Sequence, residues 1–191
     1  MKLKYNSPVV LTFSLLSLAA LILGYLTDGQ STVKYFAVYR APLTDPLTYL
    51  RLFTHVLGHS GYTHYMSNML IILLVGPALE EKYGSRQLLI GIAAAAVITG
   101  VFHMIFFRSA LMGASGVVFM MIVMASFSGF QQGTIPITLV LILVLYIGSE
   151  VVDMFINADN VSQSAHIVGG LWGLVWGWRL NQLPKPKRKA H

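Results

Sequence analysis

The chain has 191 residues, of which 55% are hydrophobic and only 10% are charged, with a mean hydropathy of +0.68 and a net charge of +6. Soluble domains carry about 25% charged residues, so this composition predicts an integral membrane protein. The sequence contains no cysteine, which excludes disulfides and thiolate metal sites. Much of the positive charge follows the last apolar run, at Lys185, Lys187, Arg188 and Lys189, and indicates a topology anchor rather than a nucleic-acid-binding surface.

Six apolar runs follow one another along the chain. The first is nearly uninterrupted, and about 20 residues are enough to cross a bilayer. No small-residue cleavage site follows it, which favours a transmembrane helix over a signal peptide. The fourth is short for a full crossing. The predicted helices cover residues 8–26, 64–79, 87–107, 115–130, 135–155 and 164–180. We therefore predict an all-α polytopic membrane protein, with six transmembrane helices in one domain over residues 1–191.

The first connection, from Thr27 to about Thr63, is too long to be a tight turn. Long loops in compact domains are usually functional or disordered. Its segment from Tyr49 to Leu57 mixes apolar and basic residues and predicts a short helix in the plane of the membrane interface.

After the second run, Glu80 and Arg86 are explained most simply as a solvated helix end.

The distribution of basic residues orients the predicted helices. With the N-terminus in the cytoplasm, six crossings return the C-terminus to the same side. Nine of the 13 Lys and Arg residues then lie inside and four lie outside. This bias predicts that both termini are cytoplasmic, in the cell membrane, and that the long first loop is external.

The segment Gly113-Ala114-Ser115-Gly116 lies between two apolar runs, at the external start of the fourth helix. The two glycines remove side chains on both sides of Ser115, so another helix or a peptide can approach it. A helix that begins near Ser115 directs free N–H groups toward its hydroxyl, which suits stabilisation of an oxyanion. The simpler explanation is a serine that only hydrogen-bonds a neighbouring helix.

Three polar side chains are expected at the same depth as Ser115. His64 and Asn68 are four residues apart near the external start of the second helix, so they share one helical face. His166 begins the sixth helix on the outside, and glycines that favour close packing follow it on the same face at Gly169, Gly173 and Gly177. The sequence therefore predicts a cavity open to the outside and lined by His64, Asn68, Ser115, Gln163 and His166.

Five segments carry a resemblance to a known family. They are Arg51 to His55, His64 to Asn68, Gly76 to Glu80 with Gly84-Ser85, Gly113 to Gly116, and Ala165 to Gly173. In this order they resemble motifs of the rhomboid intramembrane serine proteases, in their minimal bacterial six-helix form. The resemblance implies a cofactor-free endopeptidase that cleaves single-pass or polytopic membrane proteins near the outer membrane face.

The resemblance also implies a role for each site residue. Ser115 would be the nucleophile and His166 its base, without a third acid. His64, Asn68 and the Ser115 N–H would form the oxyanion hole, and Gly113, Gly116, Phe119 and Gln163 would line the site. The sequence departs from the family at Leu50, where Trp is frequent, at Phe119, where Tyr is frequent, and at Gln163, where Asn is frequent.

Three other functions are compatible with parts of the sequence. A transporter or channel would need polar residues through both leaflets, whereas here they cluster in the external half. A non-catalytic rhomboid-like protein that binds transmembrane segments would lack the serine or the histidine. A metal site could be formed by His55, His59 and His64, but no carboxylate accompanies them and a closed site usually needs four ligands.

Overall fold

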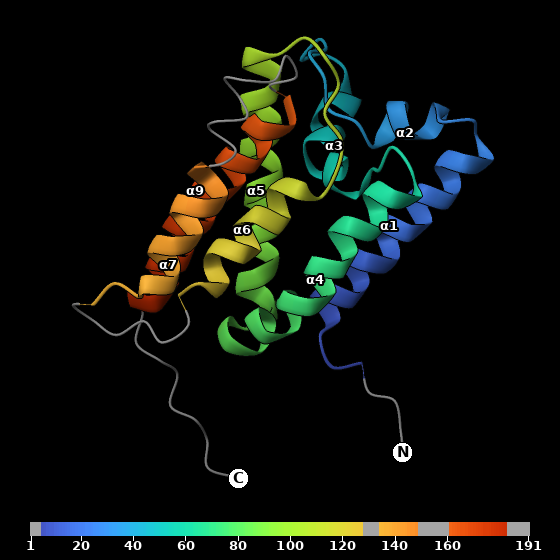
Figure 1. Cartoon of the computed structure of the whole chain (residues 1–191). Coiled ribbons are helices and arrows are strands. Elements are labelled where there is room, and N and C mark those ends of the chain that lie inside the picture. Colours follow the sequence, from blue (N-terminus) through green and yellow to red (C-terminus); the bar gives the residue numbers. More distant parts are fainter. Residues whose placement is uncertain (1–4, 128–133, 149–160, 183–191) are drawn as a thin grey trace.

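The structure, a computed structural model, describes residues 5–127, 134–148 and 161–182, and this part of the chain is built of helices and connecting loops (Figure 1). The helices are α1 (Pro8–Leu26), α2 (Gln30–Tyr35), α3 (Pro46–Thr54), the 3-10 turn η1 (His55–Leu57), α4 (Tyr62–Tyr83), α5 (Ser85–Phe106), α6 (Ser115–Ala125), α7 (Ile137–Ile142), the π-helical segment η2 (Leu143–Ile147) and α9 (Val161–Gln182). The all-α prediction is therefore confirmed for these residues. Positions 128–130 and 149–155 of the predicted fourth and fifth helices lie outside the described residues.

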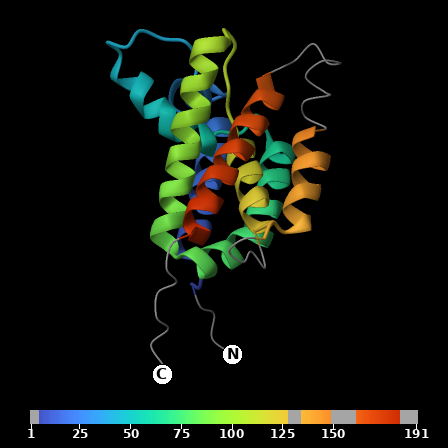
Figure 2. The same cartoon turned by 90° about the vertical axis from the view of Figure 1, so that its left-hand side faces the viewer.

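Helix α6 is the centre of the bundle. It packs against α4, α5, α7 and α9, and both views show it enclosed by neighbouring helices (Figures 1 and 2). Its residues Val117, Met120, Met121 and Met124 are fully buried. A helix that is apolar on every side is stable only when it is surrounded in this way. The start of α6 lies part-way down the bundle, below the end of α5 (Figure 1).

Helices α6 and α9 approach each other through glycines. A Cβ atom on Gly169 would overlap the carbonyl oxygen of Gly116, and one on Gly173 would lie 2.6 Å from the carbonyl oxygen of Met120. One turn further, a Cβ on Gly177 would lie 2.8 Å from the ring of Phe127. The backbones are in contact along this line because no side chain separates them, as small residues at four-residue spacing allow.

A short helix is present in the first loop where the sequence predicted one, as α3 and η1. The side chain of Asp45 caps α3 by accepting a hydrogen bond from the Leu47 N–H at 2.9 Å. Arg51 is 4% exposed, donates from Nε to the Lys34 carbonyl at 2.9 Å, and forms an ion pair with Asp45 at 3.2 Å. These bonds tie α3 to the end of α2, so the first loop is a folded unit.

The first loop also holds the segment that leads to α6. Val38 and Leu111 exchange backbone hydrogen bonds of 2.9 and 2.8 Å in an antiparallel bridge. The Gly113 N–H donates to the carbonyl of His55 at 2.9 Å. Two independent backbone connections therefore fix the residues just before Ser115.

The end of α4 differs from the expected solvated helix end. Helix α4 continues to Tyr83 and stops at Gly84, whose φ of +86° favours glycine. Glu80 is 5% exposed, and its carboxylate accepts hydrogen bonds from the N–H groups of Val9 at 3.0 Å and Val10 at 3.1 Å. Ser85 donates to the same carboxylate at 2.7 Å. Glu80 is buried because it satisfies the free N–H groups at the start of α1.

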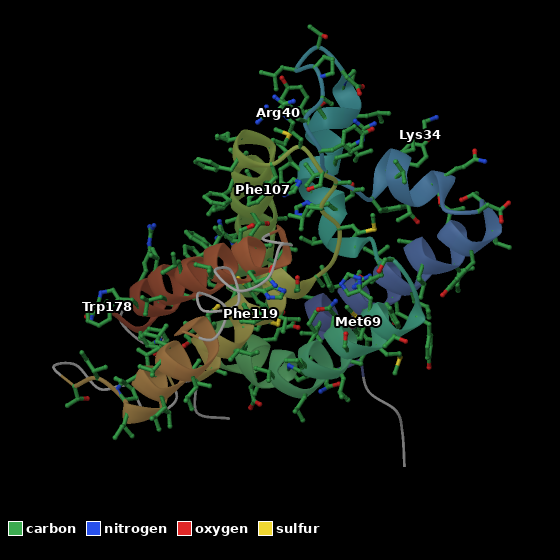
Figure 3. The ribbon with its side chains drawn as sticks, turned by 45° about the horizontal axis from the view of Figure 1, so that its top comes forward. Lys34, Arg40, Met69, Phe107, Phe119 and Trp178 are labelled. Carbon is green, nitrogen blue, oxygen red and sulfur yellow. The ribbon has the colours of Figure 1, made fainter. Side chains whose placement is uncertain are left out.

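Two helices of the described chain, α1 and α5, are long and apolar enough to cross a membrane. Helices α4 and α9 are equally long but carry polar residues, and α6 has 11 residues. Figure 3 shows Phe119 and Met69 directed into the bundle, whereas Lys34 and Trp178 point away from it. Trp178 is 48% exposed, and many other large apolar side chains on the outer faces of the helices are exposed as well. This exposure fits contact with lipid.

Candidate active site

A cavity of about 630 Å³ lies between α4, α6 and α9, beside the segment that precedes α6. The apolar residues that line it include Ile71, Val118, Phe119 and Ile122. The polar residues that line it are Ser60, His64, Ser67, Asn68, Ser115 and His166. Hydroxyl, imidazole and amide groups from four separate parts of the chain thus converge in one space.

Ser115 is the first residue of α6 and follows Ala114. The first hydrogen bond of the helix runs from the Val118 N–H to the Ala114 carbonyl at 2.9 Å. The N–H groups before Val118 have no acceptor within the helix, and they carry the partial positive charge of the helix N-terminus. The Ser115 hydroxyl therefore lies at the end of α6 that favours negative charge.

Gly113 makes room for His64. Its φ is +128°, and a Cβ atom at this position would lie 2.7 Å from Nε2 of His64. Any larger residue would push the imidazole out of the cavity and would strain the backbone. The Nε2 edge of His64 thus faces the backbone two residues before Ser115.

His64 and Asn68 occupy one face of α4, as their spacing predicts. Asn68 is 6% exposed, and its amide nitrogen donates to the His64 carbonyl at 3.0 Å. The amide has two N–H hydrogens, so a second donor is available to a group in the cavity. The His64 Nδ1 lies 3.1 Å from the Ser60 hydroxyl and 3.4 Å from the Ser60 backbone nitrogen.

His166 is held against Phe119. The two rings are parallel, with centroids 4.3 Å apart and planes inclined by 7°. Gly116 lets helices α6 and α9 approach each other here, because a Cβ atom at this position would lie 3.3 Å from the carbonyl oxygen of Ala165, the residue before His166. Phe119 thus supplies a flat stacking surface for the imidazole and brings no hydroxyl to it.

Five of the eight predicted site residues line the cavity: His64, Asn68, Ser115, Phe119 and His166. Gly113 and Gly116 contribute by the space they leave for His64 and Ala165. Gln163 lies one turn before His166 and is not among the lining residues. Ser60, which contacts His64, was not predicted; it lies in a loop, where spacing along the sequence does not define a face.

The three histidines considered as metal ligands do not form such a site. His55 is 1% exposed; its Nδ1 lies 3.0 Å from the Arg51 carbonyl, and its Nε2 lies 3.4 Å from the Thr99 hydroxyl. Among the described residues, no group of three or more His, Cys, Asp or Glu side chains is placed to hold a metal ion.

Comparison with known proteins agrees with this geometry. A sequence model described as the rhomboid domain matches residues 46–183, and the chain belongs to the rhomboid family. It is 27% identical over 186 residues to "Rhomboid protease GluP" of Bacillus subtilis strain 168, covering 91% of this chain and 36% of that protein. It is 30% identical over 149 residues to "Putative rhomboid protease YdcA" of the same strain, covering 73% and 69%. The chain thus spans about a third of the length of the first relative.

This membership defines the class of the protein. Rhomboid family members are serine intramembrane proteases, and some are inactive. The chain is therefore a membrane protein of an intramembrane protease family, and the cavity that contains Ser115 and His166 is its candidate active site.

Proposed function

We propose that this chain is a serine endopeptidase that cleaves transmembrane substrates near the outer membrane face through a dyad of Ser115 and His166. The observation that carries the proposal is that both residues line one cavity, although they are 51 positions apart in number. The stacked Phe119 ring and the glycine contacts between α6 and α9 support it, because they hold the imidazole against α6, the helix that begins at Ser115. The presence of both residues disfavours a binding-only member of the family.

The reaction follows serine–histidine logic. The Ser115 hydroxyl attacks the substrate carbonyl while His166 takes its proton. The resulting oxyanion accepts hydrogen bonds from His64, from the Asn68 amide and from the Ser115 N–H at the start of α6. His166 then gives the proton to the leaving amine as the peptide bond breaks. Water attacks the acyl-serine ester while His166 accepts its proton, and His166 then returns that proton to the Ser115 oxygen as the ester bond breaks and the acid product leaves.

The membrane sets the form of the substrate. A transmembrane helix keeps its carbonyl groups in hydrogen bonds, so it must unwind before Ser115 can attack one of them. We therefore expect substrates with helix-breaking or small residues near the outer end of their transmembrane segment. The cavity is consistent with this use, since it offers polar groups to an extended backbone.

The proposed topology has six crossings, with both termini in the cytoplasm and the first loop outside. The end of the bundle at which α1 begins is also the end at which α9 stops (Figures 1 and 2). The bias of nine to four in basic residues assigns this end to the cytoplasm. The cavity, at the other end of α4 and α9, then faces outward.

The test is cleavage of a defined substrate. The purified protein in detergent is incubated with a fusion protein that carries one transmembrane segment with small residues at its outer end, beside the Ser115→Ala variant. The wild type should cut within or at the outer edge of that segment, as located by mass spectrometry of the fragments. Binding without cleavage by both proteins would contradict the proposal and favour a binding function.

A further inference from the structure

Ser60 lies against Nδ1 of the His64 ring, whereas Gly113 faces Nε2 and Cε1 of the same ring. It belongs to the loop between η1 and α4, and its hydroxyl is 3.1 Å from Nδ1 of His64. Its backbone N–H also donates to Nδ1, at 3.4 Å. Two groups of one residue thus converge on a single ring nitrogen.

The direction of the backbone contact decides which ring nitrogen carries the proton. A backbone N–H can only donate, so Nδ1 of His64 must accept. A neutral imidazole has one donor and one acceptor nitrogen, so its proton then resides on Nε2. The hydroxyl of Ser60 can donate to the same Nδ1 lone pair and so strengthens this choice.

The position of Nε2 makes this tautomer relevant to catalysis. This nitrogen is on the edge of His64 that packs over Gly113, two residues before Ser115. A proton there is available to an oxyanion formed at Ser115, whereas a proton on Nδ1 would face the donors of Ser60. The ring is also fixed from the side by His59, whose centroid is 5.0 Å away in an edge-to-face contact.

We infer that Ser60 is a positioning residue of the active site, which holds neutral His64 as the Nε2–H tautomer and so makes it a hydrogen-bond donor to the oxyanion. This inference rests on the proposed function, because it assigns a task to the cavity in peptide hydrolysis. In this inference Ser60 acts through the His64 ring and takes no direct part in the reaction.

The chain offers a matched control in Ser67. This serine lines the same cavity and also contacts His64, but its hydroxyl donates to the His64 backbone carbonyl at 3.0 Å and not to the ring. Ser67→Ala therefore also removes a hydroxyl that contacts His64, but one that does not contact the imidazole ring. Ser60→Thr keeps a hydroxyl at the position of Ser60 and tests rescue.

The direct experiment is nitrogen NMR of the protein labelled with ¹⁵N-histidine, in which the chemical shifts of the two ring nitrogens report the tautomer. His64→Gln identifies the His64 signals. The wild type and Ser67→Ala should show a protonated Nε2 and an unprotonated Nδ1. Ser60→Ala keeps the 3.4 Å backbone contact but loses the shorter hydroxyl contact, so it should shift part of this population toward the other tautomer, and Ser60→Thr should restore it. A wild-type His64 protonated on Nδ1, or a Ser60→Ala spectrum equal to that of the wild type, would overturn the inference.

Turnover provides the second readout. Loss of the Ser60 hydroxyl should lower kcat about two- to tenfold with little change in KM, the size expected for one hydrogen bond that matters in the transition state. Ser126→Ala, which removes a hydroxyl that donates to the Val123 carbonyl outside the cavity, should keep the wild-type kcat. The spectra do not depend on activity, so a wild type that has the expected tautomer but cleaves nothing would refute the proposed protease and leave the assignment of the His64 tautomer standing.

Discussion

The ring of Phe119 is stacked on the imidazole of His166, with centroids 4.3 Å apart and planes 7° from parallel. Phe119 comes from α6, one turn after Ser115, and His166 comes from α9. The contact therefore links the helix of the proposed nucleophile to the helix of its proposed base. Because Phe119 is 7% exposed, this arrangement is part of the packed interior.

This stacking predicts how Phe119 variants behave. An aromatic pair contributes roughly 0.5–1.5 kcal/mol beyond its buried area, so Phe119→Leu should free the imidazole and lower kcat by about two- to tenfold. Phe119→Tyr keeps the stacked ring, so the activation free energy should change by much less than the roughly 1.4 kcal/mol that corresponds to a tenfold change in rate. Its activity should therefore stay within about twofold of the wild type. Steady-state cleavage of one substrate by the three proteins checks this; equal rates for Leu and Phe would show that the stack has no catalytic effect.

Asn68 tests the oxyanion site. Loss of one oxyanion donor costs roughly 100- to 1000-fold in kcat. Asn68→Ala should therefore lower kcat far more than it raises KM, and less than Ser115→Ala does, because His64 and the backbone N–H remain. The alternative is that Asn68 has a purely structural role: it holds helices together and contributes only to stability.

Two measurements on Asn68→Ala separate these explanations. Turnover per folded molecule reports the catalytic role, and the midpoint of thermal unfolding reports the structural one. A variant that unfolds at lower temperature but keeps the wild-type kcat would remove Asn68 from the mechanism.

Glu80 offers a test of the fold that is independent of catalysis. Its carboxylate accepts hydrogen bonds from Val9, Val10 and Ser85, and each buried donor left without an acceptor costs roughly 1–3 kcal/mol. Glu80→Ala should therefore lower the thermal unfolding temperature in detergent. The neighbouring Glu81 is exposed, so Glu81→Ala should leave that temperature unchanged. Equal behaviour of the two variants would mean that the cap on α1 contributes little.

The sequence predicted the helices and the cavity better than the connections between them. His64 and Asn68 could be placed together because four residues make one helical turn, and the glycines after His166 indicated a close helix contact. The bonds of Glu80 could not be foreseen, because its partners Val9 and Val10 are about 70 positions away and backbone N–H groups leave no sequence signal. The contact of Ser60 with His64 depends on a loop conformation, which residue spacing does not define.

Topology is tested by reporter fusions in cells. A reporter that is active only outside the cytoplasm should give no signal when it is fused after the C-terminus, because the proposed six crossings and the basic-residue bias would put that end inside. The same reporter inserted at Thr44, an exposed position in the first loop, should be active. A strong signal from the C-terminal fusion would show that a crossing was miscounted.

The central claim is the dyad, and cleavage by single-residue variants tests it most directly. Ser115→Ala and His166→Ala should each abolish cleavage of a transmembrane substrate while the helical circular dichroism and the unfolding temperature stay near wild type. Ser126→Ala is the matched control: this serine is also buried, at the end of α6, and its hydroxyl donates to the Val123 carbonyl at 2.6 Å, away from the cavity. It should cleave at the wild-type rate. If folded Ser115→Ala or His166→Ala cuts the substrate as fast as the wild type, Ser115 and His166 are not the catalytic dyad.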